Sequence, residues 1–554
     1  MKRFLGLVIC LAFILAAPGL AVSDEATDIT KETIVGPGSI GITAKGDIMM
    51  SFGATVRIIP TAESNWDFGL TDKVDGYLYL PVNPADLTKG FKYNLGDNFL
   101  KDHANESGWV NNEYIRTETK LHFNAMPKNR VWSFYAALEY DRPLDTSTVD
   151  SRGGINNDDS NFGLERLHIT YQMPFDMRLH AGWDIWHLDA FAGGGLIYGD
   201  DNPGFWLTGD YDTWEFNVGY FKLMENDIAS APGYLNNDSD DDRTLYAGYV
   251  TCKAIPGNEF KFMYAYDDIN KIPVTDMLGS LTKGALGITG GIPETTSHHI
   301  GLNYVGKFGD LELFGEAIYQ FGTAENTGLA YDDYDISAFA LAANVAYDFK
   351  NTFGFSFEPH IGVMYTSGDD DPTDDELNGY NGVENAQRYS KYWGGENTII
   401  GDTNLVMGSL LYGYLPEIYG NGTPVFTGGL QNMKGFGGGR GDNPGMTMLS
   451  LGLTTAPKRF LIYRTNVNIF NWNEDFKVSN IVMPAMIPAS KIESGYVGTE
   501  WDNELTFATS ANSFIRGQMS FLFPGDKLKD VTKALGAEAD EVASRLAIEF
   551  ILNF

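Results

Sequence analysis

Charged side chains recur at every second position in several short segments, and their types and spacing could form the wall of an ion pathway. In residues 115–123, Arg116, Glu118 and Lys120 alternate with apolar or β-branched residues. A period of two places alternate side chains on opposite faces of a strand. We expect the charged faces to meet water, because an arginine or lysine facing lipid at mid-membrane costs about 2–4 kcal/mol. The predicted pore-lining set is Arg57, Arg116, Glu118, Lys120, Glu139, Arg166, Arg178, Asp184, Glu312, Glu316, Glu358, Arg464, Glu500, Asp502, Glu504, Arg516 and Glu549.

This set mixes both signs of charge and is slightly richer in acids. Rings of charged side chains select ions by sign, so we expect no strong preference for anions and at most a mild preference for cations. Two interpretations stay open. The charges either line an open channel or pair with one another and fill the interior. A barrel of about eighteen strands encloses more volume than side chains can fill, which favours the channel.

Other chemistry has weak support in the sequence. His360 near Glu358 is the nearest approach to an activated base, but no recognisable catalytic motif surrounds it, so we predict that the chain is not an enzyme. The Gly-rich run 435–441 is not followed by the Lys-Ser/Thr of a phosphate loop. The adjacent His298 and His299 should point to opposite faces of one strand. We therefore predict no metal site and no cofactor.

The charge balance excludes one class of partner. The chain has 73 acidic and 39 basic residues and a net charge of −34, whereas binding to nucleic acid requires lysine and arginine to displace phosphate counterions. The acidic runs 238–242 and 369–376 could bind Ca²⁺ or bridge lipopolysaccharide through divalent ions. The spacing of a calcium-binding loop is absent, so solvated acidic loops are the favoured interpretation.

The alternation seen at 115–123 recurs in successive segments up to the end of the chain. This recurrence predicts the architecture. Short and long connections alternate along the predicted strands, with tight turns such as 126–129 and 309–310 between longer polar loops. Short turns on one rim and long loops on the other are typical of bacterial outer-membrane barrels. Only a closed sheet pairs every backbone group of its strands in lipid. The predicted strands are 47–60, 113–125, 131–142, 162–173, 177–187, 204–210, 214–224, 243–254, 259–268, 297–308, 311–321, 335–349, 354–366, 446–456, 460–472, 497–508, 513–523 and 545–554.

The start of the chain predicts export. Lys2 and Arg3 precede an apolar stretch and small residues at a plausible cleavage site, which is the pattern of a signal peptide over 1–23. After cleavage Cys252 is the only remaining cysteine, so no intramolecular disulfide is expected. We predict a short periplasmic segment at 24–45. A single all-β transmembrane barrel, antiparallel and up-and-down, then occupies 46–554, with about eighteen strands and sixteen as the alternative.

The end of the chain resembles known barrels. The last strand has one apolar face that ends on Phe550 and Phe554, and this face resembles the signal by which the barrel-assembly machinery recognises outer-membrane proteins for insertion. The stretches 497–505 and 521–526 resemble the closing strands of alginate-export-type porins. That resemblance implies an eighteen-stranded barrel in the outer membrane of a Gram-negative bacterium and a channel for anionic polysaccharide.

Function is predicted from these features together. The favoured interpretation is a porin for passive diffusion of small polar or charged solutes. The alternatives are a polysaccharide export channel and a scaffold barrel that sheathes an electron-transfer or secretion partner. Expected partners are membrane lipid and lipopolysaccharide, the assembly machinery and small solutes, with a homotrimer among the expected assemblies.

Three connections have predictions of their own. Residues 367–445 form the longest loop, which either folds into the barrel as a constriction or serves as an external cap or protomer contact. The same ambiguity applies to 61–112. A weak helical pattern at 526–545 predicts a short external helix over the final loop.

Overall fold

The fold is known from a computed structural model of the chain. It describes residues 40–44, 47–70, 72–73, 76–81, 90–96, 112–143, 162–188, 196–224, 242–270, 272–273, 291–292, 294–326, 331–371, 374–385, 399, 443–478 and 490–554. The predicted signal peptide 1–23 and most of the acidic run 238–242 lie outside these residues. Among the described residues, no helix is long and apolar enough to cross a membrane.

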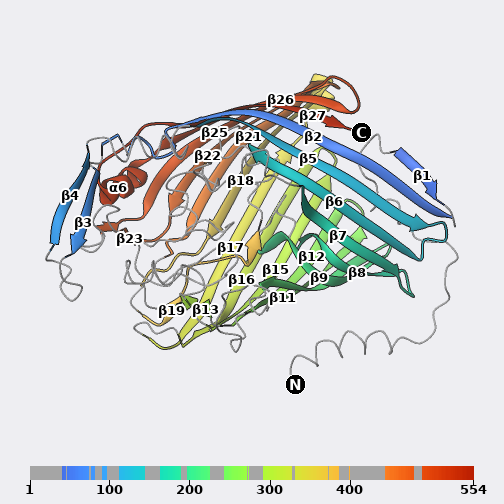
Figure 1. Cartoon of the computed structure of the whole chain (residues 1–554), viewed down its shortest axis with the longest axis horizontal. Coiled ribbons are helices and arrows are strands. Elements are labelled where there is room, and N and C mark those ends of the chain that lie inside the picture. Colours follow the sequence, from blue (N-terminus) through green and yellow to red (C-terminus); the bar gives the residue numbers. More distant parts are fainter. Residues whose placement is uncertain are drawn as a thin grey trace.

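The main sheet is a closed antiparallel barrel (Figure 1). It has 21 strands, of which β1 (Ile40–Ala44), β19 (Glu376–Leu377) and β20 (Glu384–Asn385) are short additions, so eighteen strands form the wall. The predicted number of strands is confirmed. These wall strands are β2 (Ile48–Ser64), β5 (Asn112–Pro127), β6 (Trp132–Pro143), β7 (Gly163–Gln172), β8 (Met177–His187), β9 (Tyr198–Asp210), β10 (Trp214–Met224), β11 (Arg243–Ile255), β12 (Asn258–Ile269), β15 (Glu294–Phe308), β16 (Leu311–Glu325), β17 (Tyr334–Tyr347), β18 (Ser356–Thr366), β21 (Met446–Lys458), β22 (Leu461–Trp472), β25 (Gly495–Ala508), β26 (Ser513–Pro524) and β27 (Ala543–Asn553).

The alternation of residue types becomes an alternation of environment. Along β17, buried and exposed residues alternate without a break, with Ala338 and Ala340 buried and Phe339 and Leu341 exposed on the outer face. The same pattern leaves large apolar side chains exposed around the barrel, up to 60% for Leu302. In water such a surface would drive association, whereas a bilayer solvates it. The outer face is therefore a lipid-facing band.

The barrel closes between its first and last wall strands. β2 pairs with β27 from Thr55↔Asn553 to Ser64↔Ser544, and the terminal Phe554 exchanges backbone hydrogen bonds with Ala54. Beyond that point β2 continues to Ile48, and β1 pairs with this projecting part. The segment 24–45 was predicted only as a periplasmic leader, so β1 is an addition to that prediction.

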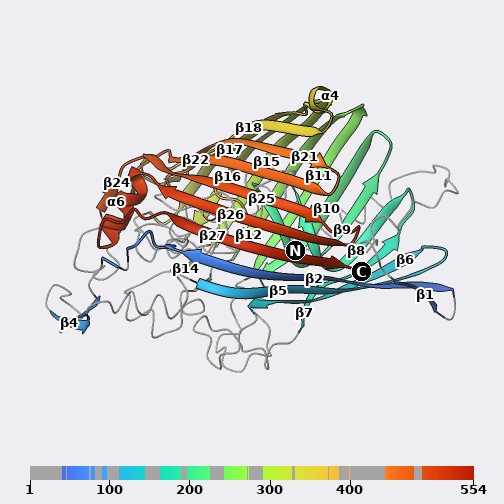
Figure 2. The ribbon, with the colours of Figure 1, turned by 90° about the horizontal axis from the view of Figure 1, so that it is seen from above.

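The predicted difference between the two rims is present. Most connections at one end are tight turns, and those at the other end are long (Figures 1 and 2). The connection between the predicted strands 335–349 and 354–366 is the short helix α4 (Lys350–Phe353), which ends at Gly354 with φ of 75°. Glycine suits that left-handed conformation because it has no Cβ.

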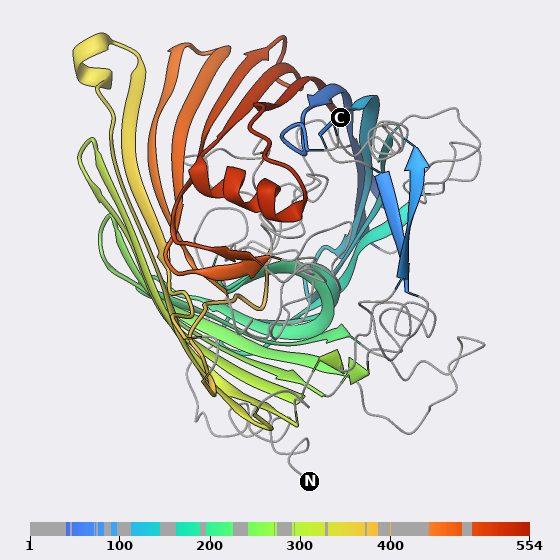
Figure 3. The ribbon, with the colours of Figure 1, turned by 90° about the vertical axis from the view of Figure 1, so that its left-hand side faces the viewer.

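Several strand boundaries differ from the prediction by three residues or more, those of β9 and β2 among them. β9 begins at Tyr198 rather than 204, because 199–202 pair with β8 despite a turn-like composition. β2 continues to Ser64, and the predicted loop 61–112 also contains the hairpin of β3 (Gly76–Pro81) and β4 (Gly90–Gly96). The hairpin lies outside the barrel wall (Figure 3).

The predicted helix near the C-terminus is α6 (Asp526–Leu535). It lies across the mouth of the barrel (Figure 3), beside β24 (Ser490–Ile492) and β23 (Phe476–Val478). Leu528 and Val531 are fully buried in a cluster with Val497 and Leu522. The prediction of an external helix was thus right in its sequence position and incomplete in its packing, because the apolar face of α6 covers the ends of the neighbouring strands.

Candidate functional site: the inner wall and the segment packed on it

A series of ion pairs runs along the inner face from β22, through the closing seam, to β8. We call it the charge belt. The Lys120 group and the Arg166–Asp184 pair are joined in it by the chain neighbours Glu165 and Arg166. The charge belt consists of Arg464, Glu504, Arg516, Glu549, Arg57, Glu118, Lys120, Glu139, Glu165, Arg166 and Asp184.

The seam lies in the middle of the charge belt. Arg516 Nη1 lies 3.1 Å from Glu549 Oε2, and its Nε lies 3.8 Å from Glu504 Oε2. The Arg57 guanidinium donates to Glu549 on one side and to Glu118 on the other. Glu549 is 1% exposed, so its charge is compensated almost entirely by these two arginines. A carboxylate that is buried to this extent is expensive unless it is paired and hydrogen-bonded.

Lys120 lies at the centre of the next part of the charge belt. Lys120 Nζ lies 2.7 Å from Glu165 and 3.1 Å from Glu139, and Arg166 Nε lies 3.7 Å from Asp184. Alternation would turn Glu165 outward, because Arg166 faces inward. A β-bulge between Ala137 and Leu138 shifts the register and allows both neighbours to contact inner groups. Glu165 was therefore missed at the sequence level.

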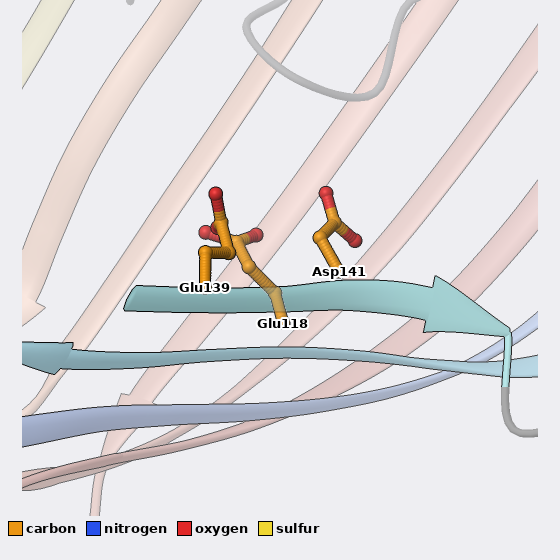
Figure 4. Close-up of side chains that lie close together, drawn as sticks. All are labelled: Glu118, Glu139 and Asp141. Atoms are coloured by element: carbon orange, nitrogen blue, oxygen red, sulfur yellow. The ribbon is translucent and has the colours of Figure 1, made fainter. Parts of the chain in front are cut away.

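Three carboxylates gather at this place (Figure 4). Oxygen atoms of Glu118, Glu139 and Asp141 lie within 4.8 Å of one another, which makes them the single group of metal-ligating side chains found among the described residues. Each carboxylate already has a cation: Arg57 pairs with Glu118, Lys120 with Glu139, and Arg116 with Asp141. With their charges matched in this way, the carboxylates act as members of the ion-pair network.

Aromatic and imidazole rings form a second row next to the charge belt. His122, Tyr135, His168, His180 and Trp206 come from the consecutive strands β5 to β9. Tyr135 stacks on His168 with ring centroids 5.4 Å apart, and His180 stacks on Trp206 at 5.1 Å. These rings pack against one another, and His168 Nδ1 also lies 3.3 Å from Asp184 Oδ2 of the charge belt.

The opposite wall carries a folded segment, residues 374–385, which we call the inner segment. β19 pairs with β17 at Asp335↔Glu376, and β20 pairs with β9 at Tyr198↔Glu384. Tyr380 and Val383 are buried in the same cluster as inner residues of β11, β12 and β17. Small and apolar residues on this wall make room for the segment.

Polar wall residues satisfy the backbone of the inner segment. Arg243 pairs with Asp267, both fully buried, and its Nη2 donates to Val383 O over 2.9 Å. Gln320 Oε1 accepts from the N–H of Asn381 at 3.0 Å, and Tyr380 Oη donates to Leu196 O at 2.7 Å. Each bond replaces water that burial removes.

The same connection contacts the far wall farther along the chain. The N–H of Ile399 donates to Glu500 Oε1 on β25 over 2.5 Å. Around the barrel, seven wall strands separate β9 from β25 on the seam side and nine on the other, so the two strands are nearly opposite. The described parts of the loop 367–445 thus contact inner groups on both walls.

The remaining predicted residues are also placed by the structure. Asp502 is buried and accepts from Ser520 Oγ and from Asn468 Nδ2. Glu316 is buried and accepts from Asn303 Nδ2 at 2.9 Å. Arg178 is buried, whereas Glu312 and Glu358 are half-buried. His299 is buried and His298 lies on the outer face, as predicted.

A buried aspartate lies where the two ends of the loop 367–445 meet, at the root of this loop. Asp369 is fully buried between the two ends of the connection: its N–H donates to Asn443 O, and its Oδ2 accepts from the N–H of Asn378. Burial, followed by the nearby Asp374 and Asp370, raises the pKa of Asp369 to about 7. The predicted solvated acidic loop 369–376 is therefore wrong for Asp369 and right for exposed members such as Asp370.

Part of the chain is similar in sequence to a known family. The profile of the alginate export family matches residues 204–416, which is less than half of the chain. Over those residues the chain is similar to the alginate export family. No curated protein shows significant similarity to it.

Several solved porins align with this barrel over most of their length at low identity. A BenF-like porin from Pseudomonas fluorescens Pf-5 is 10% identical with a TM-score of 0.45, covering 91% of this chain and 99% of the porin. OpdK of Pseudomonas aeruginosa, solved with vanillate, is 9% identical with a TM-score of 0.44 and coverages of 91% and 99%. OmpT of Vibrio cholerae, in its trimer form, is 9% identical with a TM-score of 0.39 and coverages of 92% and 99%.

Proposed function

We propose that the porin-like barrel is a passive diffusion channel for small polar or charged solutes. The observation that carries this proposal is the charge belt, because its acids and bases lie on the face opposite the lipid-facing band. Charged groups at mid-membrane depth need water or one another. Several members keep contact with solvent, such as Arg464 at 36% and Lys120 at 21% exposed, which supports a wet lumen beside them.

The inner segment is the proposed constriction of this channel. Its described residues cover the wall from β17 to β9, and Ile399 contacts β25 nearly opposite. A solute would pass between this loop and the charge belt. The two signs alternate along the belt, so the field changes sign from strand to strand, and we expect weak ion selectivity.

The alternative is export of an anionic polysaccharide, which the family match over residues 204–416 favours. A polyanion would need a path dominated by basic groups, whereas every basic member of the charge belt is paired with an acid. A solute of limited length also passes a narrowed lumen more easily than a polymer does. These two points support the diffusion channel over export.

Recording in planar bilayers tests the proposal. Purified barrel should give stable single-channel currents, and a KCl gradient should give a reversal potential near zero or slightly towards cation selectivity. Small organic ions should carry current as well. Absence of conductance from correctly inserted protein, or strong anion selectivity with block by oligomeric polyuronates, would reject diffusion and favour export.

A further inference from the structure

A polar cluster interrupts the lipid-facing band on β22 and β25. Tyr463 Oη donates to Asn503 Oδ1 over 2.8 Å, and Thr465 Oγ1 donates to the same oxygen over 3.0 Å. Trp501 Nε1 donates to Thr465 Oγ1 over 3.0 Å. Neighbouring outward positions such as Leu505 are apolar and exposed. A polar asparagine side chain on this lipid-facing side is therefore unfavourable unless another group shields it from the acyl chains.

The cluster lies deep in the membrane. Asn503 is five residues above Ala508, the end of β25 at the short-turn rim. At about 3.3 Å per residue and a tilt of about 40°, that places it roughly 13 Å from the short-turn rim, which is within the lipid-facing band of about 25 Å. Acyl chains at this depth offer no hydrogen-bond acceptor. An amide left unpaired there costs several kcal/mol.

One half of the Asn503 carboxamide has no partner. The residue is 4% exposed, and its Nδ2 makes no hydrogen bond among the described residues. Because the planar amide turns its oxygen towards β22, its nitrogen faces the β26 side. The cross-strand neighbour there is Met519, which is unbranched and 45% exposed. A flexible thioether side chain can move aside and open the amide to an incoming group.

A groove of about 790 Å³ lies over this position, lined by outward residues that include Leu505, Gly517, Met519 and Ile548. Gly517 is one of these lining residues. A Cβ built on Gly517 would meet no atom within 4 Å, whereas one on Gly322 would collide with the backbone of Thr296. The packing of the barrel itself therefore does not require glycine at 517. Bare positions on membrane-facing surfaces let another backbone approach closely.

We propose that this groove is the contact surface for a second copy of this chain, with the Asn503 amide donating across the interface. Lipid could fill the apolar part of the groove, but a chain embedded in the same membrane can bring an acceptor to this depth. A second copy carries a suitable acceptor in the same cluster, namely the Tyr463 hydroxyl oxygen, which donates its own proton to Asn503 and keeps its lone pairs. Two barrels meeting groove to groove form a closed, self-complementary pair. The pairing is independent of what crosses the lumen.

Gly517→Leu tests the proposal without disturbing the fold, because the added side chain points into the groove and meets no internal atom. The matched control is Gly315→Leu, since Gly315 also lacks neighbours within 4 Å and lines a separate outer groove of about 1030 Å³ over β11 to β18. In native mass spectrometry from mild detergent and in size-exclusion light scattering of nanodiscs, wild type and Gly315→Leu should be dimers. Gly517→Leu should be a monomer that still shows the heat-modifiable mobility of a folded barrel.

Cross-linking gives a second readout that does not depend on dimer stability. In a Cys252→Ser background, Met519→Cys treated with a short bifunctional maleimide should give a band of doubled mass. Leu302→Cys, which is exposed in the other groove, should give none. A monomeric wild type, a trimer, a dimer untouched by Gly517→Leu, or a monomer with lipid retained in the spectrum would each overturn the proposal.

Discussion

The inward-facing side chains of the two halves of the barrel wall are satisfied in different ways. From β22 through the seam to β8, charged side chains satisfy one another in the charge belt and stay near water. From β9 to β18, much of the wall is small or apolar, and the inner segment packs on it. A wall exposed to solvent can carry many charges at low cost, whereas a wall that receives a packed segment needs room and a few well-placed polar groups.

The polar groups differ accordingly. On the covered side, Arg243 and Asp267 are both fully buried and bind one another and the segment backbone. On the open side, the equivalent pair of Arg116 with Asp141 remains about one-third exposed. Pairs of the first kind fix a conformation, and pairs of the second kind contribute little stability. The comparison therefore predicts where substitutions change conductance and where they change folding.

Removing the covering loop should have the largest effect. Deletion of residues 380–440 is expected to raise single-channel conductance severalfold, because it removes the proposed constriction from the lumen. Deletion of 228–238, another connection between wall strands, serves as the control and should leave conductance close to wild type. If the first deletion also left it unchanged, the loop would not narrow the path.

Arg243→Met should loosen the inner segment. It leaves Asp267 buried without its cation and removes the donor to Val383 O, a change of about 3–5 kcal/mol in the stability of this packing. Current noise should rise, and protease should cleave the loop faster in intact barrels. Lys253→Met, which breaks a more exposed pair with Glu215, is the matched control. Equal noise in both variants would contradict the assigned role.

Arg57→Met should act on the barrel rather than on the segment. It leaves Glu118 and the buried Glu549 short of a cation at the seam, and we expect a loss of about 2 kcal/mol in the free energy of unfolding, since water reaches part of the site. Urea unfolding in lipid vesicles measures this loss. Arg116→Met should cost below about 1 kcal/mol. A larger loss from Arg116→Met than from Arg57→Met would reverse the comparison.

The packing at the root of the loop should also depend on pH. Burial raises the pKa of Asp369 to about 7, against about 3.9 in an unfolded chain. The folded state therefore holds its proton more tightly, so the packing at the loop root should weaken as pH rises from about 4 to about 7 and stay constant above that. Proteolysis of the loop across this range measures the change, and Asp369→Asn should remove it. A wild-type profile that is flat between these values would contradict the assignment.

The strands were predictable from the sequence because a lipid-facing strand needs an apolar side chain at every second position, and each segment carries that signal locally. The charge belt followed from the same alternation for Arg57, Glu118 and Lys120. Glu165 was missed because a bulge reverses its face, and the register between two strands is set by their pairing rather than by either sequence alone.

The remaining contacts could not be predicted from the sequence because they depend on packing between residues that are far apart in the chain. Nothing in the residues of 374–385 says which wall they meet, because the partners Arg243, Gln320 and Leu196 are far away in the sequence. A signal was available for Asp267, which shares the inward parity of Lys261 on β12. Its role still depended on Arg243, at the start of the neighbouring strand.

The pairing of β1 beyond the terminal residue has a practical consequence. Phe554 already bonds to Ala54, and Ile40 pairs with Phe52 directly after it on the same edge of β2. A purification tag fused to the carboxyl end would compete with the amino-terminal segment for that edge. Tags inserted in a connection on the long-loop rim, such as 327–330, would leave the junction of the two ends intact.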